Sequence, residues 1–309
     1  MRTFIIDTDA TSDDAVALIM ALREESIKIE AITVVAGAVP IEPAVKNALL
    51  SVEMANTYKP LVYKGMKKPL FRKLFTAEFV HGEDGMGNMN LPEPKIRIQE
   101  MHAIDAIINL VMNNPGKMEI ITLGPLTNLA MAVLKEPLIS KRVKNVTAMG
   151  GTGLGPGNIT PVSEFNIYVD AEAASIVLKS GMPITFVGWD VCMGKCYLNE
   201  KDLQYLSDQN SKIADFCLRC NKSLIDFNLK RLDRKGLDLP DPTAVAAAIW
   251  PDIIISQFDA YTYIETHSEL TYGQLVIDRL NLLDKEPNAK ICVELDSKKF
   301  RSLLFEHII

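Results

Sequence analysis

The stretch Phe4–Ala15, FIIDTDATSDDA, sets a short apolar run directly before a cluster of aspartates. The β-branched run Thr3–Ile6 predicts a strand, and the amphipathic stretch Asp13–Glu24 predicts a helix. A strand that leads at once into a helix is the first part of a βαβ unit. We therefore expect the chain to begin as an α/β fold.

The same alternation continues along the chain. Short apolar runs predict strands, and longer amphipathic runs between them predict helices. The predicted strands are Thr3–Ile6, Ile32–Ala36, Met118–Leu123, Val143–Met149 and Ile184–Val187, and the predicted helices are Asp13–Glu24, Pro43–Thr57, Met101–Asn113, Thr127–Lys135 and Ala171–Ser180. This alternation predicts a single α/β domain over residues 1–309, with a Rossmann-like, mainly parallel sheet flanked by helices on both faces.

Two segments depart from this pattern. Met66–Ile98 is rich in Pro, Gly, Lys and Met without periodicity, and a loop of this length in a compact domain is usually functional. Leu198–Leu239 is mostly polar helix, which favours a helical lid at about residues 198–239 over a core element. By contrast, Ala15–Ala21 and Ala244–Ile249 predict buried helix faces.

The composition excludes several classes of partner. With 309 residues, 48% of them hydrophobic, the chain can bury a large core, and no apolar run is long enough to cross a bilayer. A net charge of −6 argues against nucleic-acid binding, which needs a concentrated basic surface. We expect a cytoplasmic protein with a small-molecule partner, no nucleic acid and no membrane.

Five cysteines, an odd number, predict free thiols in a reducing compartment. Cys217 and Cys220 form a C-x-x-C pair, which leaves a zinc site as an alternative. The surrounding segment is helical in pattern, however, and a helix places these two positions on one face, where small buried thiols are common.

The aspartate cluster predicts a metal site. Asp7, Asp9, Asp13 and Asp14 place four carboxylates within eight residues, where the strand turns into the helix. Their mutual repulsion is unfavourable unless a cation lies among them, and oxygen ligands favour Ca²⁺ or Mg²⁺ over Zn²⁺. The alternative is that Ser12 or Asp13 only caps the helix while the other acids face solvent.

A second alternative comes from Asp-x-Asp-x-Thr at Asp7–Thr11, which resembles the first motif of haloacid-dehalogenase-type phosphatases. There Asp7 would be the nucleophile and Asp9 the acid/base, with Mg²⁺ between them. Such enzymes also need a later acidic motif at a strand end, and the nearest candidate, Gly188–Asp190, has the wrong spacing. This resemblance rests on one short motif.

A wider resemblance covers nearly the whole chain, to beyond Asp241. Asp7–Asp14 is similar to the Asp-x-Asp-Pro-Gly-x-Asp-Asp motif that opens nucleoside hydrolases, with Ala-Thr in place of Pro-Gly. Further matches follow in the expected order at His81–Gly87, Leu123–Asn128, Met149–Gly151 and Asn158–Asn166. The resemblance implies an N-ribosyl hydrolase that cleaves ribonucleosides to ribose and free base in purine and pyrimidine salvage, and a homodimer or homotetramer.

The resemblance also implies a calcium site. Its ligands would be Asp9, Asp14, Asp241 and the backbone carbonyl of Leu123, with Asp7 supporting the site as a ligand or as a partner of the ligands. Asp9 would take the proton from a calcium-bound water that attacks C1′ of the ribose. The alternative for Asp241 is a helix cap, because a proline and then an Ala-rich helix follow it.

By the same resemblance, further residues would bind the substrate. Asp13 and Asn166 would hold the 2′- and 3′-hydroxyls of the ribose, Asn158 and Glu164 would hold the 5′-hydroxyl side, and His81 lies in a matching loop. A 2′-deoxy substrate would leave buried polar groups unpaired, so we expect ribose specificity. For either asparagine alone, turn chemistry in the loop is the alternative.

Two positions depart from the family. Pro240 stands where many members carry a His that protonates the leaving base, and Ala38 stands where an Asn often contacts the ligand. Phe79, Trp189 or Phe227 could stack on the base instead. Besides an active ribonucleoside hydrolase, a hydrolase of a modified or non-nucleoside riboside and a non-catalytic riboside-binding homologue therefore remain as alternatives.

Overall fold

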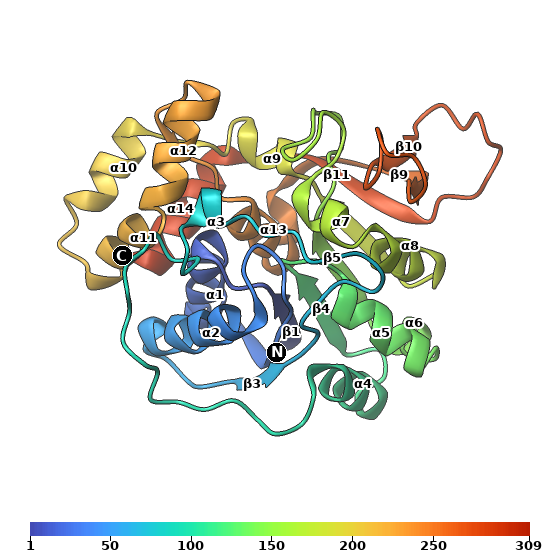
Figure 1. Cartoon of the computed structure of the whole chain (residues 1–309), viewed down its shortest axis with the longest axis horizontal. Helices are drawn as coiled ribbons and strands as arrows, with labels where there is room; N and C mark the ends of the chain where they lie inside the picture. The colour runs from blue at the N-terminus through green and yellow to red at the C-terminus, as the bar shows by residue number, and fades with distance from the viewer.

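Strand β1 (Arg2–Thr8) lies inside the nine-stranded sheet of the computed structural model, which describes residues 1–309 (Figure 1). Its neighbours on both sides, β2 (Ile27–Val34) and β4 (Met118–Thr122), run parallel to it. Phe4 and Ile6 pack into one hydrophobic cluster, and Ile5 packs into a second one. Since alternate residues of a strand point to opposite faces, both faces of the sheet are covered.

The sheet has a parallel centre and an antiparallel edge. Its strand order is β10-β9-β11-β6-β5-β4-β1-β2-β3, and only β9 runs antiparallel to its neighbours. The remaining strands of this sheet are β3 (Leu61–Lys64), β5 (Asn145–Met149), β6 (Ile184–Val187), β9 (Ile254–Ile264), β10 (Leu275–Asp278) and β11 (Ala289–Leu295), and a separate pair is formed by β7 (Leu198–Asn199) and β8 (Gly236–Leu237).

The helices form a layer on each face of the sheet (Figure 1). The first hydrophobic cluster includes residues of α1, α2, α11, α13 and α14, and the second includes residues of α4, α5 and α8. The helices are α1 (Ser12–Arg23), α2 (Ile41–Ala55), α3 (Glu78–His81), α4 (Ala103–Asn113), α5 (Thr127–Lys135), α6 (Ile139–Arg142), α7 (Phe165–Val169), α8 (Ala171–Lys179), α9 (Trp189–Met193), α10 (Glu200–Ser207), α11 (Lys212–Cys220), α12 (Lys222–Leu232), α13 (Pro240–Ile249) and α14 (Ser297–Ile308), with a short 3₁₀ turn at Pro251–Ile253. None of them combines the length and the apolar composition that crossing a bilayer requires.

The predicted fold class is confirmed. Each predicted strand and helix has a counterpart, and the helix faces Ala15–Ala21 and Ala244–Ile249 are buried. Strand β2 begins at Ile27 rather than Ile32, because its first half already alternates buried and exposed residues. Strand β3 and the C-terminal strands β9, β10 and β11 were not predicted from the sequence.

The two unusual segments differ in their packing. The long loop Met66–Ile98 contains a single helical turn, α3, which packs against α12. Residues 198–239 are largely helical, and α11 packs one of its faces into the core. Its buried Phe216, Cys217 and Cys220 join the first hydrophobic cluster, because an otherwise polar helix can still bury one apolar stripe.

All five cysteines are buried and unpaired by disulfides. Cys217 and Cys220 share the buried stripe of α11, and the Cys220 thiol donates to the backbone carbonyls of Ser12 and Cys217. Burial raises the pKa of Cys217 to about 12, so its thiol is protonated at neutral pH. These two thiols therefore act as small core side chains.

Candidate active site

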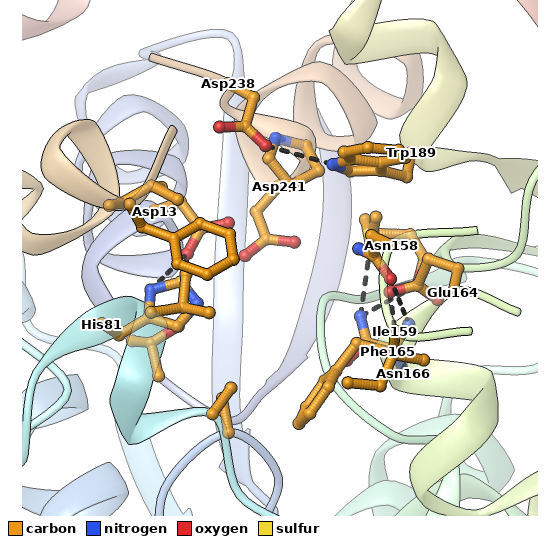
Figure 2. Close-up of a pocket in the computed structure, with 18 of the residues that line it drawn as sticks. Asp13, His81, Asn158, Ile159, Glu164, Phe165, Asn166, Trp189, Asp238 and Asp241 are labelled. Atoms are coloured by element: carbon orange, nitrogen blue, oxygen red, sulfur yellow. Dashed lines mark hydrogen bonds and ion pairs between the residues drawn. The ribbon is translucent and has the colours of Figure 1, made fainter. Parts of the chain in front are cut away.

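One cavity of about 400 Å³ lies where the parallel strands end. Segments that follow β1, β2, β4, β5 and β6 line it, together with α3, α12 and the start of α13. In parallel sheets, ligands bind beyond the carboxyl ends of the strands, where such loops converge. Figure 2 shows Asp13 and His81 on one side of the cavity and Glu164 and Asn166 on the other, with Asp241 between them.

An acidic group forms one end of this cavity. Carboxylate oxygens of Asp13, Asp14 and Asp241 lie within 4.8 Å of one another, and Asp9 lines the same end. Burial raises the pKa of Asp13 and of Asp14 to about 6. Burial, followed by the charges of neighbouring aspartates, raises the pKa of Asp9 and of Asp241 well above the ordinary value. The carboxylates therefore repel one another in the absence of a cation.

Asp14 is fixed by the turn into α1. Its carboxylate accepts a short hydrogen bond from the Thr8 hydroxyl and a second one, at 2.9 Å, from the backbone N–H of Thr11. Thr11 is the residue that caps α1, so the expectation of a cap at Ser12 or Asp13 is wrong. The other acids do not face solvent either, because each aspartate between residues 7 and 14 is at most 5% exposed.

Asp9 is held from the side of β2. Its Oδ2 atom accepts a hydrogen bond from the backbone N–H of Ala38 at 2.6 Å. A Cβ atom on Gly37 would lie 2.0 Å from the same oxygen, so only glycine leaves room for this carboxylate. The backbone N–H of Ala38 thus contacts Asp9, although its methyl side chain offers no polar contact to a ligand.

Asp7 lies buried beneath the cavity. It is fully buried and does not line the cavity. Its Oδ1 atom accepts hydrogen bonds from Thr33 at 2.6 Å and from Asn128 at 2.8 Å, while Oδ2 has no partner. Burial, opposed by these two hydrogen bonds, raises the pKa of Asp7 to about 7. The position suits a residue that supports ligands better than one that is itself a ligand.

Asp241 and Leu123 reach the acidic end from distant parts of the chain. Helix α13 begins at Pro240 and its cap position is Leu239, so the expectation that Asp241 caps this helix is wrong. The carbonyl of Leu123, just after β4, accepts a hydrogen bond from Asn166 Nδ2 at 2.9 Å. Leu123 and Asp241 both line the cavity.

The opposite side carries Asn158, Glu164 and Asn166, whereas Asp13, also expected to hold the ribose, lies in the acidic group. Burial raises the pKa of Glu164 to about 7, although backbone N–H groups, including those of Asn166 and Gly151, donate to its carboxylate. Asn158 accepts a hydrogen bond from the backbone N–H of Phe165 at 2.9 Å. Asn158 therefore orders its loop, as the turn alternative proposed, and also lines the cavity.

His81 ends α3 and faces the acidic group (Figure 2). Its Nδ1 atom lies 3.0 Å from the Ser12 hydroxyl and 3.7 Å from Asp13 Oδ1. Burial, only partly opposed by nearby carboxylates, lowers the pKa of His81 to about 4. The imidazole is therefore neutral at pH 7.

The rest of the wall is largely apolar and aromatic. All three aromatic residues expected to contact the base line the cavity, and the rings of Phe79 and Phe227 lie 6.0 Å apart. Three further polar residues of the wall, Asn228, Arg231 and Asp238, were not predicted from the sequence. Their only sequence signal is that Asp238 lies three residues before Asp241.

The phosphatase interpretation is wrong. Its nucleophile, Asp7, is buried beneath the cavity and does not line it. Its later acidic residue, Asp190, accepts hydrogen bonds from the backbone N–H groups of Gly153 and Leu154 and does not join the acidic group. The two residues thus have separate structural roles.

Known proteins match this chain over its whole length. The family described as inosine-uridine preferring nucleoside hydrolase matches residues 4–302. The pyrimidine-specific ribonucleoside hydrolase RihA of Shewanella baltica is 35% identical and aligns with 99% of this chain and 96% of its own. Among solved structures, the plant nucleoside hydrolase PpNRh1 has a TM-score of 0.94 at 30% identity, covering 99% of this chain and 98% of its own. A purine-preferring ribonucleoside hydrolase from Gardnerella vaginalis has a TM-score of 0.91 at 28% identity, with the same coverage.

Proposed function

Because the chain belongs to the inosine-uridine preferring nucleoside hydrolase family, and is a hydrolase of ribonucleosides to ribose and free base, we propose that Asp9 is its catalytic base. The observation that carries this proposal is the buried acidic group at one end of the cavity. Asp9 lines that end, and its backbone contact with Ala38 fixes one carboxylate oxygen while the other remains for a proton.

A calcium ion fits this acidic group. Carboxylates of Asp13, Asp14 and Asp241 lie together, Asp9 lines the same cavity, and none of the four forms a salt bridge with a lysine or arginine. Hard oxygen donors of this kind match Ca²⁺. We propose Asp9, Asp14, Asp241 and the Leu123 carbonyl as ligands, with Asp7 as a supporting residue. When bound, calcium supplies positive charge that offsets the carboxylates and lowers the pKa of the attacking water.

The ribose is proposed to lie between the acidic group and the Glu164 side. Asp13 belongs to the acidic group, and we assign it, with Asn166, to the 2′- and 3′-hydroxyls. Asn158 and Glu164 are assigned to the 5′-hydroxyl side. These polar side chains orient C1′ for attack, and the pairing favours ribose over 2′-deoxyribose.

The reaction breaks the bond between C1′ and the base nitrogen, whose electron pair leaves with the base. Water forms the new bond to C1′ and gives a proton to Asp9. The nearby carboxylates stabilise the positive charge that develops on the ribosyl group. The base that leaves with this electron pair gains a proton to become the free base, which balances the proton that Asp9 receives from water. Pro240 cannot supply that proton, whereas neutral His81 lines the same cavity. His81 is therefore the candidate for contact with the base.

The substrate range is tested directly. The enzyme is incubated with uridine, cytidine, inosine and adenosine, and free base is measured by chromatography. Release of at least one base supports the proposed function and names the preference. The panel includes both pyrimidine and purine ribosides, because one similar protein is named as pyrimidine-specific and another as purine-preferring. No release from any of them would favour a modified riboside or a binding role.

We further propose a cytoplasmic homodimer or homotetramer, as the family resemblance implies. Light scattering coupled to size-exclusion chromatography measures this state, since one chain has a mass of 34.2 kDa. A monomeric mass at working concentration would contradict it.

A further inference from the structure

Asp238 is a buried carboxylate in the cavity wall that the proposed reaction does not use. It lies between β8 and α13 and is 5% exposed. Its Oδ2 atom accepts a hydrogen bond from Trp189 Nε1 at 3.1 Å, and its Oδ1 atom accepts one from Asn228 Nδ2. Figure 2 shows the bond that joins this carboxylate to the indole. Both oxygens thus have neutral donors.

The partners of Asp238 lie on two separate elements that line the cavity. Trp189 is the first residue of α9, one residue after β6, and is 9% exposed. Asn228 is buried in α12, whose neighbouring residues Leu224 and Phe227 also line the cavity. A single carboxylate therefore links α9, α12 and the segment that leads to Asp241.

A buried indole N–H needs an acceptor, and only one orientation of the ring satisfies it. Without Asp238, the N–H would remain unpaired or the ring would turn to another rotamer. We propose that Asp238 is a positioning residue that fixes the indole of Trp189 as a wall for the bound riboside and ties α12 to that wall. This inference rests on the proposed function, since it concerns binding in the same cavity.

The proposed role requires a hydrogen-bond acceptor in the place of the Asp238 carboxylate, not its negative charge. In an Asp238→Asn variant, the amide oxygen accepts from the indole, and the amide N–H₂ donates to Asn228 once that amide turns over to present its oxygen. Asp238→Leu has similar volume but accepts no hydrogen bond. Asp238→Asn should therefore preserve riboside binding, and Asp238→Leu should weaken it.

The test combines kinetics with fluorescence. The chain has two tryptophans, and Trp250, at the far end of α13, packs at a tilt against His307 outside the cavity. In a Trp250→Phe background, Trp189 is the only indole reporter, and acrylamide quenching measures how firmly its ring is held. Kinetics on the best riboside of the panel are measured for Asp238→Asn, Asp238→Leu and Trp189→Phe, with Trp250→Phe as the matched control.

We expect Asp238→Leu and Trp189→Phe each to raise KM about tenfold with kcat changed less than about threefold, because a fixed wall contributes to binding throughout the reaction. Asp238→Asn should stay within about threefold of the parent enzyme. Quenching of Trp189 should increase in Asp238→Leu alone. The double variant should be no worse than either single variant, since both remove the same bond.

Two results would overturn the proposal. One is an Asp238→Asn variant that raises KM as much as Asp238→Leu, or that lowers kcat about tenfold or more, which would assign the residue a charge or proton role. The other is an unchanged KM in Trp189→Phe, a variant that keeps a buried ring and tests the proposal even if Asp238→Leu fails to fold. A failure of the proposed function can be told apart from these two results. In that case the parent enzyme would release no ribose from any riboside, while riboside binding could still be measured as quenching of Trp189 fluorescence.

Discussion

At the scale of single residues, neighbours leave each acid of the cavity little freedom. The Asp14 carboxylate is bound by Thr8 and Thr11, and Asp9 is bound by the backbone of Ala38. Side chains held in this way lose little conformational freedom when they bind a metal or a substrate. The site is therefore organised by local turns as much as by the acids themselves.

Gly37→Ala should abolish most activity while the fold survives. The added Cβ would lie 2.0 Å from Asp9 Oδ2, so the proposed base must move. A displaced catalytic group reduces the rate about 100-fold. Steady-state kinetics and thermal unfolding test this together. Gly194→Ala is the matched control, because its nearest atom is 3.6 Å away. Normal kcat in Gly37→Ala would show that Asp9 is not the base.

Asp241→Asn should weaken calcium binding about 100-fold, since one charge is removed from a site built of few ligands. Titration calorimetry on the chelator-treated protein measures the change in Kd. Asp284→Asn is the control, because Asp284 is exposed and adopts a positive φ that Asn also tolerates. Equal calcium affinity in the Asp241 variant and the parent would remove Asp241 from the ligand set.

Most residues that the family resemblance assigned to the site line the cavity, whereas Asp7 lies buried beneath it. The sequence did not predict Asp238 or Asn228. Their role depends on which side chain faces them, and neither residue is close in sequence to Trp189. Contacts of this kind follow from tertiary packing and leave no local pattern.

At the scale of elements, an ion-pair network links β1 to β4. The Glu119 carboxylate on β4 receives hydrogen bonds from Arg2 on β1 and from Lys144, just before β5. Arg2 also donates to carbonyls at the end of α13. Burial raises the pKa of Glu119, but these bonds outweigh it and hold the pKa below its usual value.

Glu119→Gln should lower the free energy of unfolding by about 1 kcal/mol at pH 7, an estimate reduced because Arg2 and Lys144 are partly exposed. A carboxyl with a lowered folded pKa stabilises the fold above its unfolded pKa, and that stability disappears as the pH falls through the folded value. The difference should therefore shrink as the pH falls below the ordinary glutamate pKa of about 4.3, and vanish only below the lower folded value. Urea unfolding at several pH values measures it, with exposed Glu286→Gln as control. A constant difference across pH would contradict this account.

The elements themselves were largely readable from local patterns. The central strands are continuous apolar runs, and the helices between them have long periodic stretches. The end of strand β9 also follows a strand pattern, since Ala260, Thr262 and Ile264, at every second position, are buried. The buried face of α11 is hard to recognise in the sequence, because only a narrow apolar stripe interrupts its polar residues.

At the scale of the whole molecule, the cavity joins segments that lie between Asp9 and Asp241 in the sequence. Parallel strands with intervening helices bring successive loops to one edge, which explains why motifs far apart in sequence meet. The order of the strands, and the antiparallel edge formed by β9, depend on crossovers that no local pattern encodes.

Calcium should stabilise the entire fold, since its proposed ligands come from the β1–α1 turn, β4 and α13 and meet only in the native state. At free calcium about 100 times Kd, the gain is about 2.7 kcal/mol, which raises Tm by several degrees. Differential scanning calorimetry with calcium, magnesium or chelator measures it. A Tm that does not respond to calcium would contradict the proposed site.

The most direct test of the central claim is ribose release from the preferred riboside, with and without chelator, by the parent enzyme and by Asp9→Ala. The account predicts release that chelator stops, that added calcium restores, and that Asp9→Ala lacks while it still binds riboside. Release that persists in Asp9→Ala, or that ignores the chelator, would contradict the proposed roles of Asp9 and of the metal.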